Sequence, residues 1–172
     1  MKATGILRRI DELGRVVIPK EIRKSMKMRE GEELEIYTTE EEVVLRKYSE
    51  MSSLEKFSRT LAAAIYKVTG KAAIITDTDK VIAAAGKGVP EEGSAIPDAL
   101  RHLLEERRRV TLGEGRCHTF GVEGVRSEIV QPILSAGDLF GAILILSKEP
   151  VTKADEQLAA TGASFFEEQI GR

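Results

Sequence analysis

Four cations recur at helical spacing in the stretch PKEIRKSMK, which covers residues 19–27. They stand at i, i+3, i+4 and i+7, so a helix places all four on one face: Lys20, Arg23, Lys24 and Lys27. Only Glu21 interrupts them, whereas a face built for solubility alone mixes both signs. Unneutralised arginine and lysine side chains attract the phosphates of nucleic acids. The stretch therefore predicts a helix that docks on duplex DNA.

The net charge of −2 conceals a segregation of charge along the chain. Residues 1–29 hold nine cations and three anions, whereas residues 30–50 hold eight glutamates and two cations. The local field, rather than the charge of the whole chain, decides which partner is attracted. The first thirty residues are therefore the part of the chain that we expect to face a polyanion.

The elements that position the basic helix are predicted to follow a β-β-α-β-β order. We expect strands at residues 3–11 and 15–18, joined by a turn in which Gly14 takes a positive φ. A second hairpin is expected after the helix, with strands at residues 33–38 and 42–48.

The helix itself is predicted over residues 20–26, with Pro19 at its first position. Ile22 and Met26 are spaced to form its inward face, opposite the cations. The first fifty residues contain few large apolar side chains. A unit of this size rarely stabilises itself alone, so we expect it to share its core with a second copy.

Residues 1–48 resemble the AbrB-type swapped-hairpin DNA-binding domain, and the core RRIDELGRVVIPKEIR, residues 8–23, is highly specific to that family. The resemblance implies that two chains interleave their hairpins into one β-barrel that binds double-stranded DNA. It implies DNA contacts from Arg8, Arg15, Arg23 and Lys24, with additional contacts from Lys2, Arg9 and Lys20. Lysine reaches phosphate as a point charge, so base readout is less expected at Lys24.

A different pattern begins near residue 50 and predicts a second domain over residues 51–172. We expect a linker helix at 51–69, strands at 72–76 and 80–86, a helix at 96–109, a β-hairpin at 127–148 and a helix at 152–170. Weaker strand signals cover residues 110–122. The hairpin and the amphipathic helix after it resemble a GAF-type sensor domain. The expected fold class is α+β, with an intertwined swapped-hairpin barrel followed by a GAF-like α/β sandwich.

Such a domain can hold a small molecule on its sheet beneath residues 86–109, or it can assemble an oligomer; no ligand-binding residue is identified. The linker helix carries a stripe of apolar residues, Leu54, Phe57, Leu61 and Val68. This stripe either packs on the domain's own sheet or forms a short coiled coil with the same helix of a second copy. The C-terminal helix has the same two options. Separate contacts in the two domains would give a homodimer through the first and a tetramer, a dimer of dimers, through the second.

Little in the chain predicts catalysis, a metal or another cofactor. Cys117 is the one cysteine, which excludes an internal disulfide framework and a multi-thiolate metal site within one chain. His102 and His118 are isolated histidines, and Asp77 and Asp79 are typical of a turn. No apolar run approaches a membrane span and the N-terminus does not read as a signal peptide, so we expect a cytoplasmic protein.

Three functions remain in competition. The two domains together are similar to a family of sporulation transcription regulators, which makes a DNA-binding regulator the leading hypothesis. An antitoxin is the first alternative, because some antitoxins share the swapped-hairpin fold. An enzyme on the GAF-type domain is the second, although no nucleophile–base pair supports it.

Overall fold

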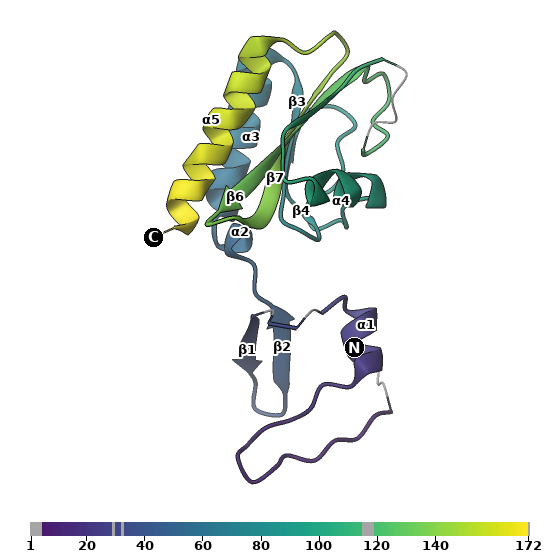
Figure 1. Ribbon diagram of the computed structural model, residues 1–172, viewed down its shortest axis with the longest axis vertical. Coiled ribbons are helices and arrows are strands. Elements are labelled where there is room, and N and C mark those ends of the chain that lie inside the picture. Colours follow the sequence, from purple (N-terminus) through teal and green to yellow (C-terminus); the bar gives the residue numbers. More distant parts are fainter. Residues whose placement is uncertain (1–4, 29, 32, 115–118, 172) are drawn as a thin grey trace. The chain divides into compact units, whose positions relative to one another are not determined.

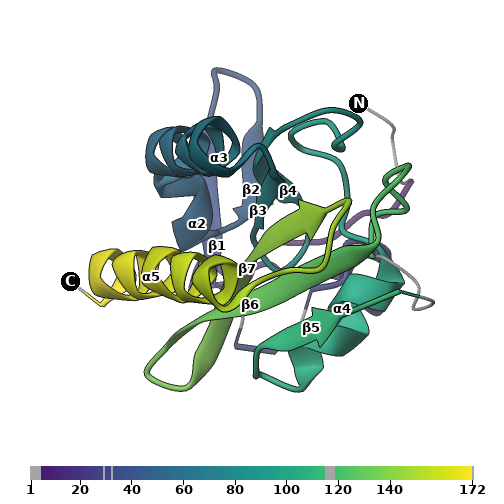
Figure 2. The same ribbon diagram turned by 90° about the horizontal axis from the view of Figure 1, so that it is seen from above.

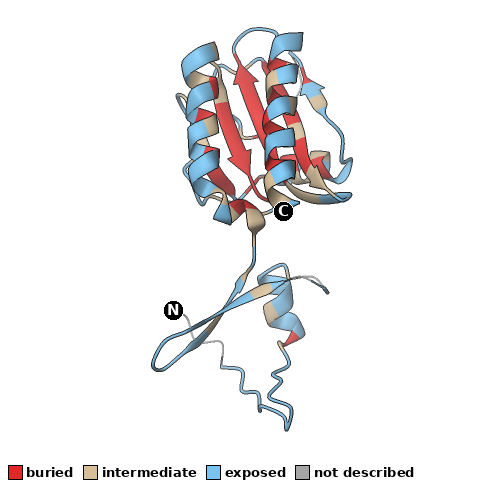
Figure 3. Ribbon diagram, turned by 90° about the vertical axis from the view of Figure 1, so that its left-hand side faces the viewer, coloured by how far each residue is buried: buried red, intermediate tan, exposed pale blue. Residues whose placement is uncertain are grey.

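The computed structural model describes residues 5–28, 30–31, 33–114 and 119–171. The chain divides into two compact units, Met1–Tyr48 and Ser49–Arg172, which are described separately (Figure 1). Burial differs sharply between them. Figure 3 shows buried residues along the strands of the second unit, whereas almost every described residue of the first unit is at least partly exposed.

The first unit contains a short helix and a β-hairpin. Helix α1 spans Lys20–Ser25, and the antiparallel strands β1 and β2 span Leu34–Thr38 and Val43–Lys47. The amide of Thr39 donates to the carbonyl of Glu42 at 2.9 Å, which closes the turn between the strands. The predicted second hairpin is therefore confirmed.

The two strands predicted before the helix are wrong for the single chain. Residues 5–18 are extended but belong to no sheet. The turn within this segment is closed by the amide of Asp11, which donates to the carbonyl of Arg15, and Gly14 in the turn has a φ of 76°. A strand exists only where a neighbour satisfies its amides and carbonyls, and β1 and β2 already pair with each other.

The second unit is built on one antiparallel sheet of five strands in the order β4-β3-β7-β6-β5. Their bounds are Ala72–Thr76 for β3, Val81–Ala85 for β4, Val110–Leu112 for β5, Ser127–Ser135 for β6 and Asp138–Ser147 for β7. Helices α3, Glu55–Thr69, and α5, Lys153–Ile170, lie side by side on one face (Figures 1 and 2). Helix α4, Asp98–Glu105, covers the opposite face.

Alternation along the central strand β7 divides the core into two layers. Ile143 and Ile145 join Phe166 of α5 and Ile65 of α3 in the first layer. Leu144 and its neighbours on the other face join Leu100 and Leu104 of α4 in the second layer. Leu100 and Leu104 of α4 are therefore buried against the sheet on this face.

Two predicted helices have different bounds in the structure. The linker helix is interrupted at Leu54, which separates the single turn α2, Glu50–Ser53, from α3. Helix α4 stops at Glu105, because Arg107 has a φ of 49° and leaves the helical conformation. The predicted C-terminal helix is confirmed, and Thr152 caps it by a reciprocal pair of hydrogen bonds with Asp155.

Candidate nucleic-acid interface

Helix α1 presents three cations to solvent. The carbonyl of Pro19 accepts the first helical hydrogen bond from Arg23 at 2.9 Å, so Pro19 caps the helix and lies just before it. Lys27 lies beyond the end of the helix with a φ of 52° and leaves the predicted stripe. The remaining set is called here the α1 cations and comprises Lys20, Arg23 and Lys24, all exposed.

None of the α1 cations makes an ion pair or side-chain hydrogen bond with the described part of the chain. The predicted inward face behind them is only partly formed. Ile22 is half-buried, whereas the Met26 side chain is 44% exposed, so the expectation that both are buried is wrong for one chain. The helix is too short to cover both residues without further apolar surface against it.

Arg15 is positioned by an interaction that the sequence analysis missed. Its backbone amide donates to Oδ1 of Asp11 at 2.8 Å, and its Nε donates to Oδ2 at 2.7 Å. These hydrogen bonds, the backbone one first, lower the pKa of Asp11. Asp11 and Arg15 lie four residues apart on the two sides of a turn that contains Gly14, and this spacing is the sequence signal that could have indicated the pair.

The remaining predicted DNA contacts lie on the extended segment before the turn. Arg8 and Arg9 are both exposed. Arg8 lines the same cavity as Ile22 and Met26 of α1, and Arg9 does not, as expected for consecutive residues of an extended chain. Lys2 lies outside the described residues.

The first unit also leaves an unusual amount of apolar surface uncovered. Leu7 is 90% exposed, and a cavity of about 300 Å³ between the extended segment, α1 and β2 is lined mainly by apolar side chains. The other large exposed apolar residues of this unit are Ile6, Ile10, Leu13, Val16, Val17, Met26, Ile36, Tyr37, Val43, Leu45 and Tyr48. Soluble proteins rarely leave so large an apolar surface free, so it calls for a partner.

The predicted oligomer stripe of the second unit divides into two pairs. Leu54 and Leu61 pack against the unit's own core. Phe57 is 50% exposed and Val68 82% exposed, so these two do face outward. The Phe57 ring lies 5.8 Å from the ring of Phe165 on α5, which extends the outward patch across both helices.

The residues considered for metal or cofactor chemistry have structural roles. Oδ1 of Asp77 accepts from the amides of Asp79 and Lys80 at 2.7 Å each, and Asp79 pairs with Arg101 at 3.3 Å, which confirms the turn interpretation. His102 is exposed beside Glu105. The described residues contain no cluster of three potential metal ligands. Cys117 and His118 lie outside the described residues.

The three consecutive arginines after α4, at residues 107–109, interact with other groups of the second unit. Arg107 donates to the carbonyl of Gly137, and Arg108 pairs with Glu106 at 2.6 Å. Arg109 pairs with Glu156 at 3.4 Å. This run therefore adds little to a nucleic-acid surface, and the α1 side of the first unit remains the candidate interface.

Comparison with known proteins defines the class of this molecule. The chain is 54% identical over 48 residues to the transition state regulatory protein AbrB of Bacillus subtilis (strain 168), which covers 28% of this chain and 50% of AbrB. It also matches the GAF domain of an Acinetobacter phosphoenolpyruvate-protein phosphotransferase, with a TM-score of 0.57 and 14% identity over 67% of this chain and 80% of that one. The α+β class, with an AbrB-type unit followed by a GAF-like unit, is confirmed.

The particular family follows from a full-length relative. Stage V sporulation protein T of Bacillus subtilis (strain 168) is 38% identical over 176 residues, covering 99% of both chains. The family described as stage V sporulation protein T C-terminal, transcription factor, matches residues 53–171, and the one described as antidote-toxin recognition MazE, bacterial antitoxin, matches residues 7–52. The chain belongs to the stage V sporulation protein T family, which is one of transcription factors and not of enzymes.

Proposed function

We propose that this protein regulates the transcription of sporulation genes by binding double-stranded DNA through its first unit. The observation that carries the proposal is the set of α1 cations, which are exposed and make no ion pair within the described part of the chain. Lys2, Arg9 and Lys20 add charge around the same surface in the proposal. The full-length similarity to stage V sporulation protein T supports both the DNA partner and the sporulation role.

The proposed DNA-binding form is a homodimer. The apolar cavity beside α1 and the extended segment of residues 7–18, which joins no strand within the described part of the chain, are features that a second copy completes by adding strands to both chains. Such a dimer is the intertwined swapped-hairpin barrel expected from the sequence. It brings two sets of α1 cations into one particle and doubles the number of phosphate contacts.

The second unit is proposed to assemble the oligomer or to sense a small ligand. The outward patch of Phe57, Val68 and Phe165 supports a contact between copies, and it would join two dimers into a tetramer. No helix among the described residues has the length and apolarity to cross a bilayer. We propose that the protein acts in the cytoplasm, where its DNA target lies.

An antitoxin remains the alternative function, because the first unit matches the MazE antitoxin family. Antitoxins of this fold typically carry a short tail that orders on a toxin. In this chain residues 50–171 instead contain a five-stranded sheet with a complete core, which favours the regulator. Co-purification with a small toxin would reverse that preference.

The division of labour is tested by comparing the full chain with a fragment of residues 51–172. The full chain is expected to shift a random-sequence duplex in a gel assay. The fragment is expected to unfold cooperatively, because both core layers lie within it, and to leave the duplex unshifted. A fragment that binds the duplex as tightly as the full chain would refute the proposed location of the DNA site.

A further inference from the structure

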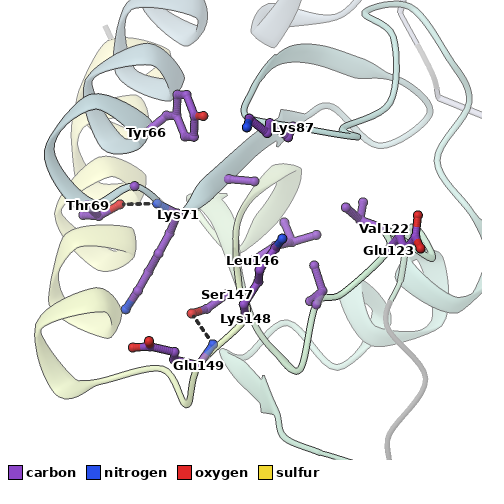
Figure 4. A pocket seen from close by; sticks show the side chains of 13 residues that line it. Tyr66, Thr69, Lys71, Lys87, Val122, Glu123, Leu146, Ser147, Lys148 and Glu149 are labelled. Carbon is purple, nitrogen blue, oxygen red and sulfur yellow. Dashed lines mark hydrogen bonds between the residues drawn. The ribbon is translucent and has the colours of Figure 1, made fainter.

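A pocket of about 440 Å³ lies at one end of the sheet in the second unit (Figure 4). Its floor is Ala72 of β3 and Leu146 of β7, which face each other in register. Val122 and Val125, from the segment before β6, form a wall. The volume lies within the range of small-molecule sites, and polar and charged side chains surround the apolar floor.

Two lysine ammonium groups at this pocket have no partner among the described residues. Lys87 and Lys148 line it, and neither forms an ion pair or side-chain hydrogen bond with any described residue, although Glu123 and Glu149 line the same pocket. The third lysine is different. Lys71 donates to Oδ2 of Asp155 at 2.5 Å, and Figure 4 shows its side chain running away from the others.

Two glycines close to Lys87 and Lys148 have positive φ angles, which disfavour other residues. Gly86 precedes Lys87 with a φ of 135°, and a Cβ on it would lie 2.6 Å from the Cβ of Ala72. Gly124 has a φ of 75°, and a Cβ there would lie 3.7 Å from Nζ of Lys148. Gly86 therefore lets the Lys87 loop approach β3 closely, whereas at Gly124 it is the positive φ and not the space beside Lys148 that favours glycine.

We propose that this pocket binds a small organic anion, with a carboxylate or phosphate group held by Lys87 and Lys148 and an apolar part on Ala72 and Leu146. An anionic group that lies between the two ammonium groups can form a charge-assisted hydrogen bond with each of them. The hydroxyl of Tyr66, from α3, is a further donor at the rim. The proposal deepens the sensing role proposed above and rests on it.

The site is tested by lysine NMR on the full chain, with every lysine ¹³C-dimethylated so that its charge is kept. Inorganic phosphate and malonate are titrated separately at constant ionic strength, and signals are assigned from K87M and K148M. The Lys87 and Lys148 signals are expected to shift together with one Kd of about 1–10 mM, as befits a minimal anion. The tighter of the two probes identifies the phosphate or the carboxylate class.

Substitutions in the pocket are expected to change the Kd of the anion in opposite directions. K87M removes one charge-assisted bond and should raise the Kd read at Lys148 about tenfold. E123Q removes a repelling charge and should lower that Kd about twofold. The matched control is K153M, a lysine at the start of α5 outside the pocket, which should leave the Kd unchanged.

Two results would overturn the site. Equal, non-saturating shifts at all lysines would show that the anions only screen charge. A higher Kd for the anion in E123Q than in the unsubstituted chain would show that the pocket does not bind anions. Binding of duplex DNA by the unsubstituted chain is measured in parallel. Loss of DNA binding would refute the proposed function, whereas intact DNA binding without a saturable shift at Lys87 refutes only the pocket.

Discussion

The carboxylate of Asp155 in the second unit accepts hydrogen bonds from two different residues, Lys71 and Thr152. Its Oδ2 accepts from Lys71 Nζ at 2.5 Å and from the amide and hydroxyl of Thr152 at 2.7 and 2.8 Å. Burial raises the pKa of Asp155, but the hydrogen bonds from Lys71 and Thr152 outweigh it, so the net pKa is lowered. One carboxylate thus caps α5 and ties it to the start of β3.

Asp155→Asn should destabilise the second unit by about 1–3 kcal/mol at pH 7, because it leaves the half-buried Lys71 ammonium without its counter-charge. A lowered pKa stabilises the folded state above the unfolded value, about 3.9, and the gain is lost as pH falls through the folded pKa. The difference between wild type and variant in urea unfolding should therefore shrink below about pH 4. A difference that is constant from pH 7 to pH 2 would contradict this role for the charge.

Residue-level roles were predictable from sequence only where the partners are close along the chain. The spacing of Lys20, Arg23 and Lys24 indicated a shared helix face directly. Lys71 and Asp155 stand 84 positions apart, and no local pattern connects them. The Asp11–Arg15 pair lies within reach of pattern analysis, yet it was missed because Arg15 was considered only for its charge.

At the level of elements, the alternation of apolar and polar residues and the helix-capping residues predicted most helices and strands of the second unit. The sheet strands, the hairpin of β6 and β7 and the cap of α5 at Thr152 follow from local composition. The errors lie where tertiary contacts override propensity. Arg107 leaves α4 early and donates to a distant carbonyl, and the break at Leu54 turns the linker helix so that Leu54 and Met51 both reach the core.

The outward patch on α3 and α5 carries the next prediction. Phe57→Ser should lower the subunit count of the full chain in native mass spectrometry, from tetramer to dimer, because it removes an aromatic side chain from a contact between copies. The thermal stability of the second unit should hardly change, since Phe57 is half exposed. Lys56→Ser, on the same helix, is the control. An unchanged subunit count in the Phe57 variant would assign the patch no role in assembly.

At the scale of the whole molecule, the second unit buries its apolar side chains in a core of its own, whereas the first unit leaves most of its apolar side chains exposed. Residues 5–18 form no strand and leave a row of apolar side chains exposed, for which sequence analysis predicted a second copy. A fragment of residues 1–50 should therefore melt at a temperature that rises with protein concentration, as folding coupled to dimerisation requires. Differential scanning fluorimetry over a hundredfold concentration range measures it. A concentration-independent melt of a species that sediments as a monomer would contradict the shared core.

The central claim is that a dimer of this chain holds duplex DNA through the α1 surface by charge. Seven candidate cations per chain are Lys2, Arg8, Arg9, Arg15, Lys20, Arg23 and Lys24. If about half of those in a dimer touch phosphate, log K should fall with log salt at a slope near −6. Arg23→Ala removes two contacts per dimer and should reduce the magnitude of that slope by about two, whereas Lys153→Ala should leave it unchanged.

The most direct measurement is therefore the salt dependence of duplex binding for the full chain, its Arg23→Ala variant and the Lys153→Ala control, made by fluorescence anisotropy on one labelled duplex. A steep slope that flattens only in the Arg23 variant is the predicted result. Equal changes in both variants would show diffuse attraction by the whole protein, and an unchanged slope in the Arg23 variant would remove α1 from the interface.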